Sequence, residues 1–312
     1  MPIAIGGNLI HVNKYLTNLS TITPQEGAVA DAIMPPFKVN QDSDIYSEYS
    51  RTGTHRVLND QLAKGQQPRQ IETGYIQHTY TCDRYALSDY VYDQDVRNAD
   101  NPIRPFEDSM FSLRTLHQLA RERRVLNQAF SALVPGAAVA GGAWNVAAGT
   151  PIRDVTDAMA AIWAATQCKA NAIVIPMSRA ITLSRCTEWA AQFTFTETGF
   201  RGGLFNIFTG FENFGLEVFI SGLCGLTTNQ GTASDPDDFE GLLGNRALVF
   251  VRKPSPTLRT RCFGFSPYTK QNEVWTGRGS FEEKIGATYT KIESQIDELL
   301  IDVNCGYQIT GI

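Results

Sequence analysis

The most restrictive feature of this sequence is a periodic segment after Pro105, in which an apolar residue recurs every three or four positions as far as Leu133. This spacing predicts an amphipathic helix, and Pro135 with Gly136 would end it. A helix of roughly 28 residues is about 42 Å long, so it would run the length of a medium-sized domain. Four charged residues fall mainly between the apolar ones: Arg114, Arg121, Glu122 and Arg124.

The first 44 residues show no sustained period of helix or strand. Short apolar groups alternate with turn-forming residues, among them Pro24, Gly27, Pro35 and Pro36. Such a segment is too apolar to stay solvated and too irregular to fold alone. We therefore expect an extended arm that lies on other parts of the molecule or on neighbouring molecules.

A long hairpin is predicted next. Two strand-like runs, 45–58 and 70–82, flank a polar segment in which Gly65 and Pro68 supply the turn. The runs alternate aromatic and polar residues but carry little apolar surface, and an isolated two-stranded ribbon is marginally stable in water. We expect this hairpin to rest on something else, such as another subunit.

The region after the long helix alternates helix and strand. A second helix is expected where Asp154 would cap it, and a third begins near Ser178. A buried-strand pattern lies at 172–175 and a further strand at 216–221, so the region has the character of an α/β layer. The apolar face of the second helix comprises Val155, Ala158, Met159, Ile162 and Trp163.

The last third of the chain is rich in strand patterns separated by Pro, Gly and Asn turns. We expect antiparallel strands that return beneath the long helix, which makes the fold class α+β. No internal repeat of solenoid or propeller length is visible. The strand-like runs are 247–254, 259–268, 272–278, 282–294 and 298–309.

Composition excludes several classes of protein. A formal net charge of -5 and a pI near 5.5 argue against a basic face that reads nucleic acid. No apolar run is long enough for a membrane span or is placed like a secretory signal. The six cysteines lack any C-x-x-C pair, so we expect reduced thiols in a cytoplasm that serve mostly as small core residues.

Chemical motifs are weak throughout. His78 and Cys82 share a strand face but would stand about 13 Å apart, too far for a nucleophile and its base. The histidines lack metal-ligand spacing, and the acidic run 234–241 reads as a solvated turn more readily than as a cation site. A hydrolase with a Cys or Ser nucleophile has no supporting G-x-S-x-G or Cys/His/Asp signature. We expect no enzymatic activity and no cofactor.

Three stretches resemble the major capsid proteins of tailed bacteriophages, which have the Hong Kong 97 capsid fold. Residues 80–130 are similar to the segment that joins the hairpin loop to the spine helix of those proteins. Ala143 and Trp144, followed by 150–162, resemble the passage into the axial domain, and 169–183 resemble its first strand, turn and next helix. The order of these segments is more specific than any one of them.

The resemblance implies a division of the chain. Residues 1–44 would be the N-terminal arm and 45–84 the E-loop hairpin. A peripheral domain with the spine helix would comprise 85–150 and 253–297, and an axial domain 151–252 and 298–312. The chain lacks a long charged helical extension before the arm, which implies a separate scaffolding protein or none.

The function implied is structural: self-assembly into pentamers and hexamers of an icosahedral head that encloses double-stranded DNA without reading its sequence. Partners would be copies of the chain and, beside them, scaffolding, portal and decoration proteins. The protein would reside in the virion after assembly in the bacterial cytoplasm, with no membrane association. An encapsulin-like cellular compartment of the same fold is the alternative.

Six residues are candidates for contacts between subunits. Lys64, at the presumed E-loop tip, invites comparison with a crosslinking lysine of the fold's namesake, although an exposed tip lysine is common in any loop. The basic cluster at 121–124 is either a solvated helix face or a source of salt bridges to acidic groups of another subunit, such as Glu48. The other candidates are Arg121, Arg123, Arg124, Glu282 and Glu283.

Overall fold

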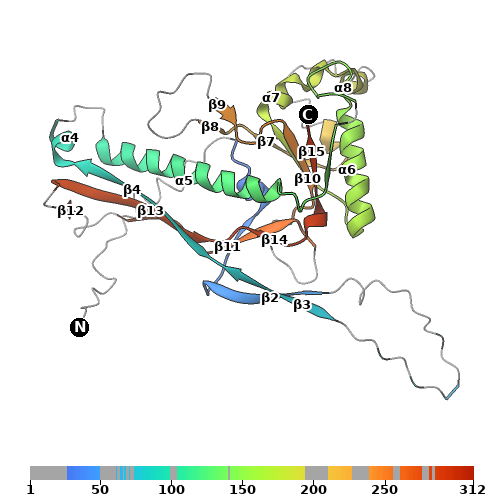
Figure 1. Ribbon diagram of the computed structural model, residues 1–312, viewed down its shortest axis with the longest axis horizontal. Coiled ribbons are helices and arrows are strands. Elements are labelled where there is room, and N and C mark those ends of the chain that lie inside the picture. Colours follow the sequence, from blue (N-terminus) through green and yellow to red (C-terminus); the bar gives the residue numbers. More distant parts are fainter. Residues whose placement is uncertain are drawn as a thin grey trace.

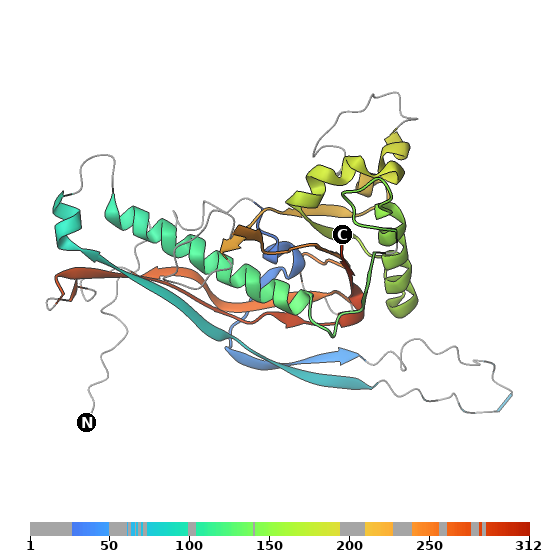
Figure 2. The ribbon, with the colours of Figure 1, turned by 45° about the horizontal axis from the view of Figure 1, so that its top comes forward.

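A six-stranded sheet, a five-stranded sheet and one long helix organise the computed structural model of this chain (Figure 1). The long helix lies across the first sheet, and the second sheet with its helices stands at one end (Figure 2). The structure describes residues 27–49, 74–98, 104–139, 141–193, 210–226, 239–255, 261–275, 281–282 and 285–312, with a few further positions between 61 and 70.

Helix α5 (Pro105–Ala129) confirms the predicted long helix and has 25 residues. Pro105 lies in its first turn, where a missing backbone N–H breaks no hydrogen bond. The helix ends before the predicted stop at Pro135. The backbone N–H of Gln308 in the second sheet donates to the Pro135 carbonyl at 2.9 Å. The residues around Pro135 therefore lie against that sheet and do not continue the helix.

The six-stranded sheet lies beneath α5, as predicted for the returning antiparallel strands. Strands β4 and β13 pair over ten positions, from Asp83 opposite Ile296 to Tyr92 opposite Ala287, and both strands contact α5. Strand β11 flanks β13 on its other side, and the short strand β1 adds to β11 in parallel. The strands are β1 (Pro36–Lys38), β4 (Asp83–Tyr92), β11 (Gly264–Trp275), β12 (Phe281–Glu282), β13 (Ala287–Ile296) and β14 (Leu299–Leu300).

The five-stranded sheet has the order β5-β15-β10-β6-β7. Strand β6 is buried at every position, which confirms the strand predicted from its continuous apolar run. The strands of this sheet are β5 (Gly136–Ala138), β6 (Ala172–Pro176), β7 (Glu217–Ser221), β10 (Arg246–Phe250) and β15 (Gly306–Thr310). The helical segments near it are α6 (Pro151–Thr166), α7 (Met177–Thr182), η1 (Leu183–Arg185), α8 (Thr187–Phe193) and η3 (Val303–Cys305).

Helix α6 differs from its prediction in two respects. It begins at Pro151, so Asp154 lies inside the first turn and not at the cap. The buried Asp154 carboxylate instead accepts a hydrogen bond from the indole Nε1 of Trp144 at 2.9 Å. Trp163, expected on the apolar face with Ile162, is exposed, because only the Val155, Ala158 and Ile162 side of the helix meets the second sheet.

The described part of the arm lies on other parts of its own molecule, which is one of the two placements that the sequence predicted. Helix α2 (Ala30–Ile33) and its flanks Val29 and Met34 are buried in the main hydrophobic core. The guanidinium of Arg252 donates to the Ala32 carbonyl at 3.1 Å and so holds this segment to the second sheet. Apolar residues that look isolated along the sequence therefore pack against distant strands.

The hydrophobic core has two parts that α5 connects. Near its N-terminus, Met110 and Leu113 pack on Ile292 and Leu87 of the first sheet. Near its C-terminus, Val125 and other apolar residues join a larger cluster that extends through the second sheet. The middle of α5 lies between these two apolar regions.

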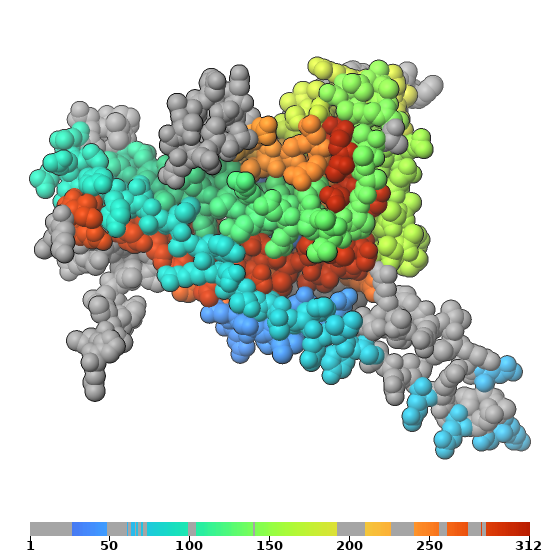
Figure 3. Space-filling view, viewed as in Figure 1, coloured from blue at the N-terminus to red at the C-terminus, as the bar shows by residue number. Residues whose placement is uncertain are grey.

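The predicted hairpin is confirmed at its base. Strands β2 (Ser43–Tyr49) and β3 (Tyr75–Thr81) pair antiparallel, with Ser43 opposite Thr81 and Tyr49 opposite Tyr75. Among the described strands they pair only with each other. We call β2 and β3 together the ribbon; it lies along the lower edge of the body in Figures 1 and 3. The domain boundaries given above stay a prediction.

Three further elements complete the described chain. Helix α4 (Asp93–Asn98) follows β4 at the far end of the first sheet. Strands β8 (Cys224–Leu226) and β9 (Phe239–Gly241) form a small antiparallel pair beside the second sheet.

Candidate functional site

The ribbon presents apolar side chains to solvent. Ile45 is 56% exposed and Ile76 is 54% exposed, and Tyr75 is exposed as well. The ribbon is tied to the body only near its base in the described contacts: the Thr81 backbone N–H donates to Asp297 Oδ2 at 3.0 Å. Large apolar side chains on a projecting ribbon remain costly to hydrate unless another surface covers them.

Ile45 and Ile76 lie on opposite faces of the ribbon, and the face of Ile76 also carries polar pairs within the subunit. The rings of Tyr46 and His78 stack with centroids 5.4 Å apart. His78 Nε2 also lies 3.2 Å from Glu48 Oε2. Glu48 is therefore engaged within the ribbon of its own subunit, and the predicted pairing of this residue with the basic cluster of another subunit stays a prediction.

His78 and Cys82 have separate environments and do not form a nucleophile and base pair. His78 faces Glu48, while the Cys82 thiol is buried and directed at the Pro267 carbonyl. Burial raises the pKa of Cys82 to about 11 and that of Cys262 to about 12, and it also raises the pKa of Cys305. These thiols are the small core residues that were predicted.

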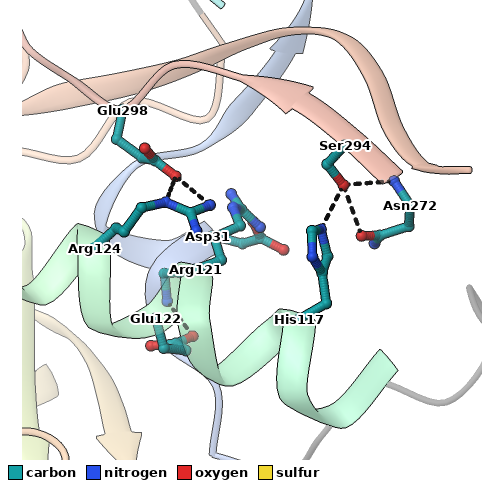
Figure 4. A network of polar contacts seen from close by, with 9 residues as sticks. Asp31, His117, Arg121, Glu122, Arg124, Asn272, Ser294 and Glu298 are labelled. Carbon is teal, nitrogen blue, oxygen red and sulfur yellow. Dashed lines mark hydrogen bonds and ion pairs between the residues drawn. The ribbon is translucent and has the colours of Figure 1, made fainter. Parts of the chain in front are cut away.

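A seam of polar side chains interrupts the apolar contact beneath the middle of α5 (Figure 4). We call it the polar seam. Arg114, His117, Arg121 and Arg124 follow the three- and four-residue spacing of one helix face, and Glu122 lies on another side of the helix, toward α2. The polar seam comprises Arg114, His117, Arg121, Glu122 and Arg124.

His117 joins α5 to two strands of the first sheet. Its Nε2 lies 2.8 Å from the Ser294 hydroxyl of β13, which also accepts the backbone N–H of Asn272 of β11 at 2.9 Å. Burial, with the positive charges of Arg124 and Arg121, lowers the pKa of His117 to about 4. The imidazole is therefore neutral at ordinary pH.

Glu122 and Arg121 hold α2 from adjacent positions of α5. The buried Glu122 Oε1 accepts the backbone N–H of Ala30 at 2.7 Å, and Arg121 Nη1 lies 2.6 Å from Asp31 Oδ1. Burial raises the pKa of Glu122 to about 7, although the hydrogen bond from Ala30 partly opposes this shift. The described part of the arm is thus attached to the long helix by one buried carboxyl and one ion pair.

Arg124 closes the seam at its C-terminal end. Its Nε donates to Glu298 Oε1 at 3.1 Å, and its guanidinium carbon lies 3.6 Å from the centre of the Tyr85 ring. The Glu298 side chain is only 3% exposed. This contact joins α5, β4 and the segment that follows β13.

The candidate contact residues have distinct settings. Lys64 and Arg123 are exposed, whereas Arg121 and Arg124 pair with carboxylates of their own chain. Glu282 lies 3.4 Å from the hydroxyl of Tyr90, which donates to it. Within one chain the structure does not bring these arginines to Glu282, so contact between subunits stays a prediction. Glu283 lies outside the described residues.

The sequence offered no signal for the partners within the polar seam. The hydrogen bond between Ala30 and Glu122 spans 92 positions, and that between Arg124 and Glu298 spans 174. Carboxylates so far apart are indistinguishable in the sequence from solvated surface groups. Only the packing of α2 and β13 against α5 identifies them.

A cavity of about 240 Å³ lies in the polar seam, between α5, α2 and β11. Arg124 does not contribute to its wall, and Asp31 at its edge is 63% exposed, so solvent reaches the cavity. Its lining consists of Ala28, Ala30, Asp31, Arg114, His117, Gln118, Arg121, Glu122, Gln271 and Asn272.

Groups of three or more potential metal ligands do not occur among the described residues. The acidic run 234–241 falls largely outside them. None of the helices that the structure describes is both long and apolar enough to cross a membrane.

A helix across a mixed sheet, a second sheet with its own helices and a projecting ribbon together define the phage capsid fold, which confirms the predicted fold class. A phage-related protein from Bordetella bronchiseptica is similar, with a TM-score of 0.67 and 14% identity over 97% of this chain and 98% of that chain. The capsid of the cyanophage P-SCSP1u has a TM-score of 0.56 and 10% identity over 89% of this chain and 86% of its own.

A virus-like particle from Pyrococcus furiosus also matches, with a TM-score of 0.53 and 10% identity over 94% of this chain and 95% of that chain. No protein-family model and no curated protein matches the sequence. The likeness is therefore one of fold across almost the entire chain.

Proposed function

We propose that this chain is the major capsid protein of a tailed bacteriophage. Copies would assemble into pentamers and hexamers of an icosahedral head that encloses double-stranded DNA. The observation that carries the proposal is that the likeness to phage capsid structures covers nearly all of both chains. A similarity confined to one domain would not cover so much of both chains.

The exposed isoleucines on the two faces of the ribbon support assembly. Burying an Ile side chain contributes roughly 1.5–3 kcal/mol, and both Ile45 and Ile76 are more than half exposed in the subunit. A neighbouring subunit that covers them gains this free energy. Many copies of such a modest contact can stabilise a closed shell whose interfaces are heterologous.

The charge of the chain suits a container for DNA. A formal net charge of -5 leaves few free cations for phosphate contacts, which need Lys and Arg. An inner wall that is neutral or acidic would let DNA pack without adhering to the shell. Scaffolding, portal and decoration proteins are the further partners of this proposal, with assembly in the bacterial cytoplasm and final residence in the virion.

The test is electron microscopy of the expressed chain, alone and with candidate scaffold genes, alongside the double variant Ile45→Ser, Ile76→Ser. We expect regular shells or tubes from the wild type and soluble, folded subunits that do not assemble from the variant. Leu133→Ser is the matched control, because this leucine is 75% exposed but lies outside the ribbon. A wild-type chain that stays a compact monomer under all conditions would overturn the proposal.

A cellular compartment that holds protein cargo is a second candidate, and the match to the virus-like particle from Pyrococcus furiosus favours it. The two candidates differ in the contents of the particle. Native particles that contain genome-length DNA support the phage head, and particles with protein cargo and no nucleic acid support the compartment.

A further inference from the structure

The two strands of the ribbon use only half of their backbone groups to pair with each other. The Cys82 backbone N–H donates to the Asp42 carbonyl at 2.7 Å. Hydrogen-bonded and non-hydrogen-bonded pairs alternate along an antiparallel ladder, so in this register the even-numbered residues of both strands carry the bonds between β2 and β3. The odd-numbered residues direct their backbone N–H and carbonyl groups outward, to the two edges of the ribbon.

The outer edge of β2 is partly closed by its own acidic residues. The outward N–H of Ile45 donates to the Oδ1 of the adjacent Asp44 at 2.8 Å. Glu48 adds a second carboxylate to the same strand. Charged side chains on an edge strand hinder pairing with another chain, so β2 is a poor acceptor for a further strand.

The outer edge of β3 is open beyond the base of the ribbon. At the base, the outward N–H of Thr81 is used by Asp297. Among the described strands β3 pairs only with β2, which leaves the outward groups of Tyr75, Gln77 and Thr79 without a strand partner there. The strand carries no Asp, Glu, Lys or Arg, and Figure 2 shows it on the side of the ribbon away from the body. Such an edge is a template for an added strand.

We infer that the outer edge of β3 pairs antiparallel with the same edge of a second copy of this chain, about a two-fold axis at Gln77. In this register Gln77 lies opposite Gln77 of the second copy, and Tyr75 lies opposite Thr79 of the second copy. Every outward backbone group of these three residues then gains a hydrogen-bonding partner. The inference rests on the proposed function only in that copies of the chain must meet.

Charge and strand number both favour pairing through β3. The side chains brought together are neutral, and a Tyr opposite a Thr is an aromatic and β-branched pair that stabilises sheets. Pairing through β2 would instead bring Asp44 and Glu48 of two copies near one another, and like charges across strands are destabilising. The product of pairing through β3 is a four-stranded sheet, whereas an isolated two-stranded ribbon is marginally stable.

The test is disulfide trapping of the full-length chain with diamide as the oxidant, on assembled particles and on the concentrated soluble chain. The register places the two Cα atoms of residue 77 about 5.5 Å apart, a distance that a disulfide spans. We expect Gln77→Cys to give a covalent dimer. Ser47→Cys is the matched control, because Ser47 is exposed and lies opposite Gln77 on β2. It should give no more dimer than the wild-type chain.

Charge substitutions test the two-fold axis without cysteine chemistry. Gln77→Lys places two ammonium groups opposite each other and Gln77→Glu places two carboxylates there, so each variant alone should lose the contact. An equal mixture of the two variants should regain it, because opposite charges then face each other. Particle yield and sedimentation of the soluble chain measure the contact, and Ser47→Lys with Ser47→Glu are the matched controls that should behave as the wild type does.

Two results would overturn the inference. One is a Gln77→Cys dimer no more abundant than that of Ser47→Cys in both samples. The other is a mixture of the charge variants that performs no better than either alone, which would indicate that β3 pairs with a different segment. Regular shells without the crosslink would overturn this inference and leave the proposed function standing. A crosslinked dimer without shells would support the inference and count against the proposed function.

Discussion

Glu122 makes the stability of this subunit depend on pH in a direction opposite to that of most carboxylates. Its pKa is about 7 in the folded chain and 4.5 as the ordinary value. The fold therefore favours the protonated form. The stability that this provides is fully present below pH 4.5 and is lost as the pH rises through 7.

Replacement by Gln measures this effect directly. Gln keeps an oxygen for the Ala30 backbone N–H and removes the buried charge. The difference between a pKa of about 7 and one of 4.5, at about 1.4 kcal/mol per pH unit, gives roughly 3.5 kcal/mol as an upper value. We expect Glu122→Gln to exceed the wild type in free energy of unfolding by up to about 3.5 kcal/mol at pH 8, and the two to agree at pH 4.5.

His117 titrates in the opposite sense within the same seam. Its pKa is about 4 against an ordinary 6.5, so the stability from the neutral imidazole is present above pH 6.5 and is lost as the pH falls through 4. The two groups offset each other between about pH 4.5 and 6.5 in the wild type. Without the opposing effect of Glu122, the titration of His117 should lower the free energy of unfolding as the pH falls from 6.5 toward 4.

The assay is urea unfolding of the unassembled chain in chloride buffers, followed by the fluorescence of the buried Trp144 and Trp189. Glu282→Gln serves as the control, because Glu282 is exposed on the same subunit. A stability difference between Glu122→Gln and the wild type that stays constant from pH 4.5 to pH 8 would refute the reasoning.

Two further substitutions test the buried polar contacts by urea unfolding. Trp144→Phe removes the donor to the buried Asp154 and should cost about 1–3 kcal/mol of unfolding free energy; an unchanged midpoint contradicts this. Arg124→Ala leaves the Glu298 carboxylate buried without its partner and should cost about 3 kcal/mol or more, whereas Arg123→Ala should stay within about 0.5 kcal/mol of the wild type. Equal effects of the two alanine variants would show that the pair with Glu298 contributes nothing.

Local pattern was sufficient to predict several elements. The period of three to four predicted α5, the short apolar run predicted β6, and alternation around a turn predicted the base of the ribbon. These features depend on neighbouring residues alone, because side-chain period follows directly from backbone geometry. The order of such elements along the chain was also enough to indicate the phage capsid fold.

Local pattern failed where a tertiary partner decides which face is buried. The periodic Leu116 and Leu133 are exposed, while Arg114, His117 and Glu122 of the same region are buried. The helix is rotated so that these polar groups meet α2 and the first sheet. Distant residues supply hydrogen bonds to them, as Ala30 does for Glu122 Oε1 and Ser294 does for His117, and such bonds reduce the cost of burying a polar group.

By itself, the sequence of this protein determined which segments become helix or strand, since that choice rests on periodicity within about ten residues. Tertiary structure alone decided that part of the arm enters the core and that the charged middle of α5 faces inward. The physical reason is that each of these features is a contact between groups far apart in the chain, and burial and pairing have no counterpart in a local pattern.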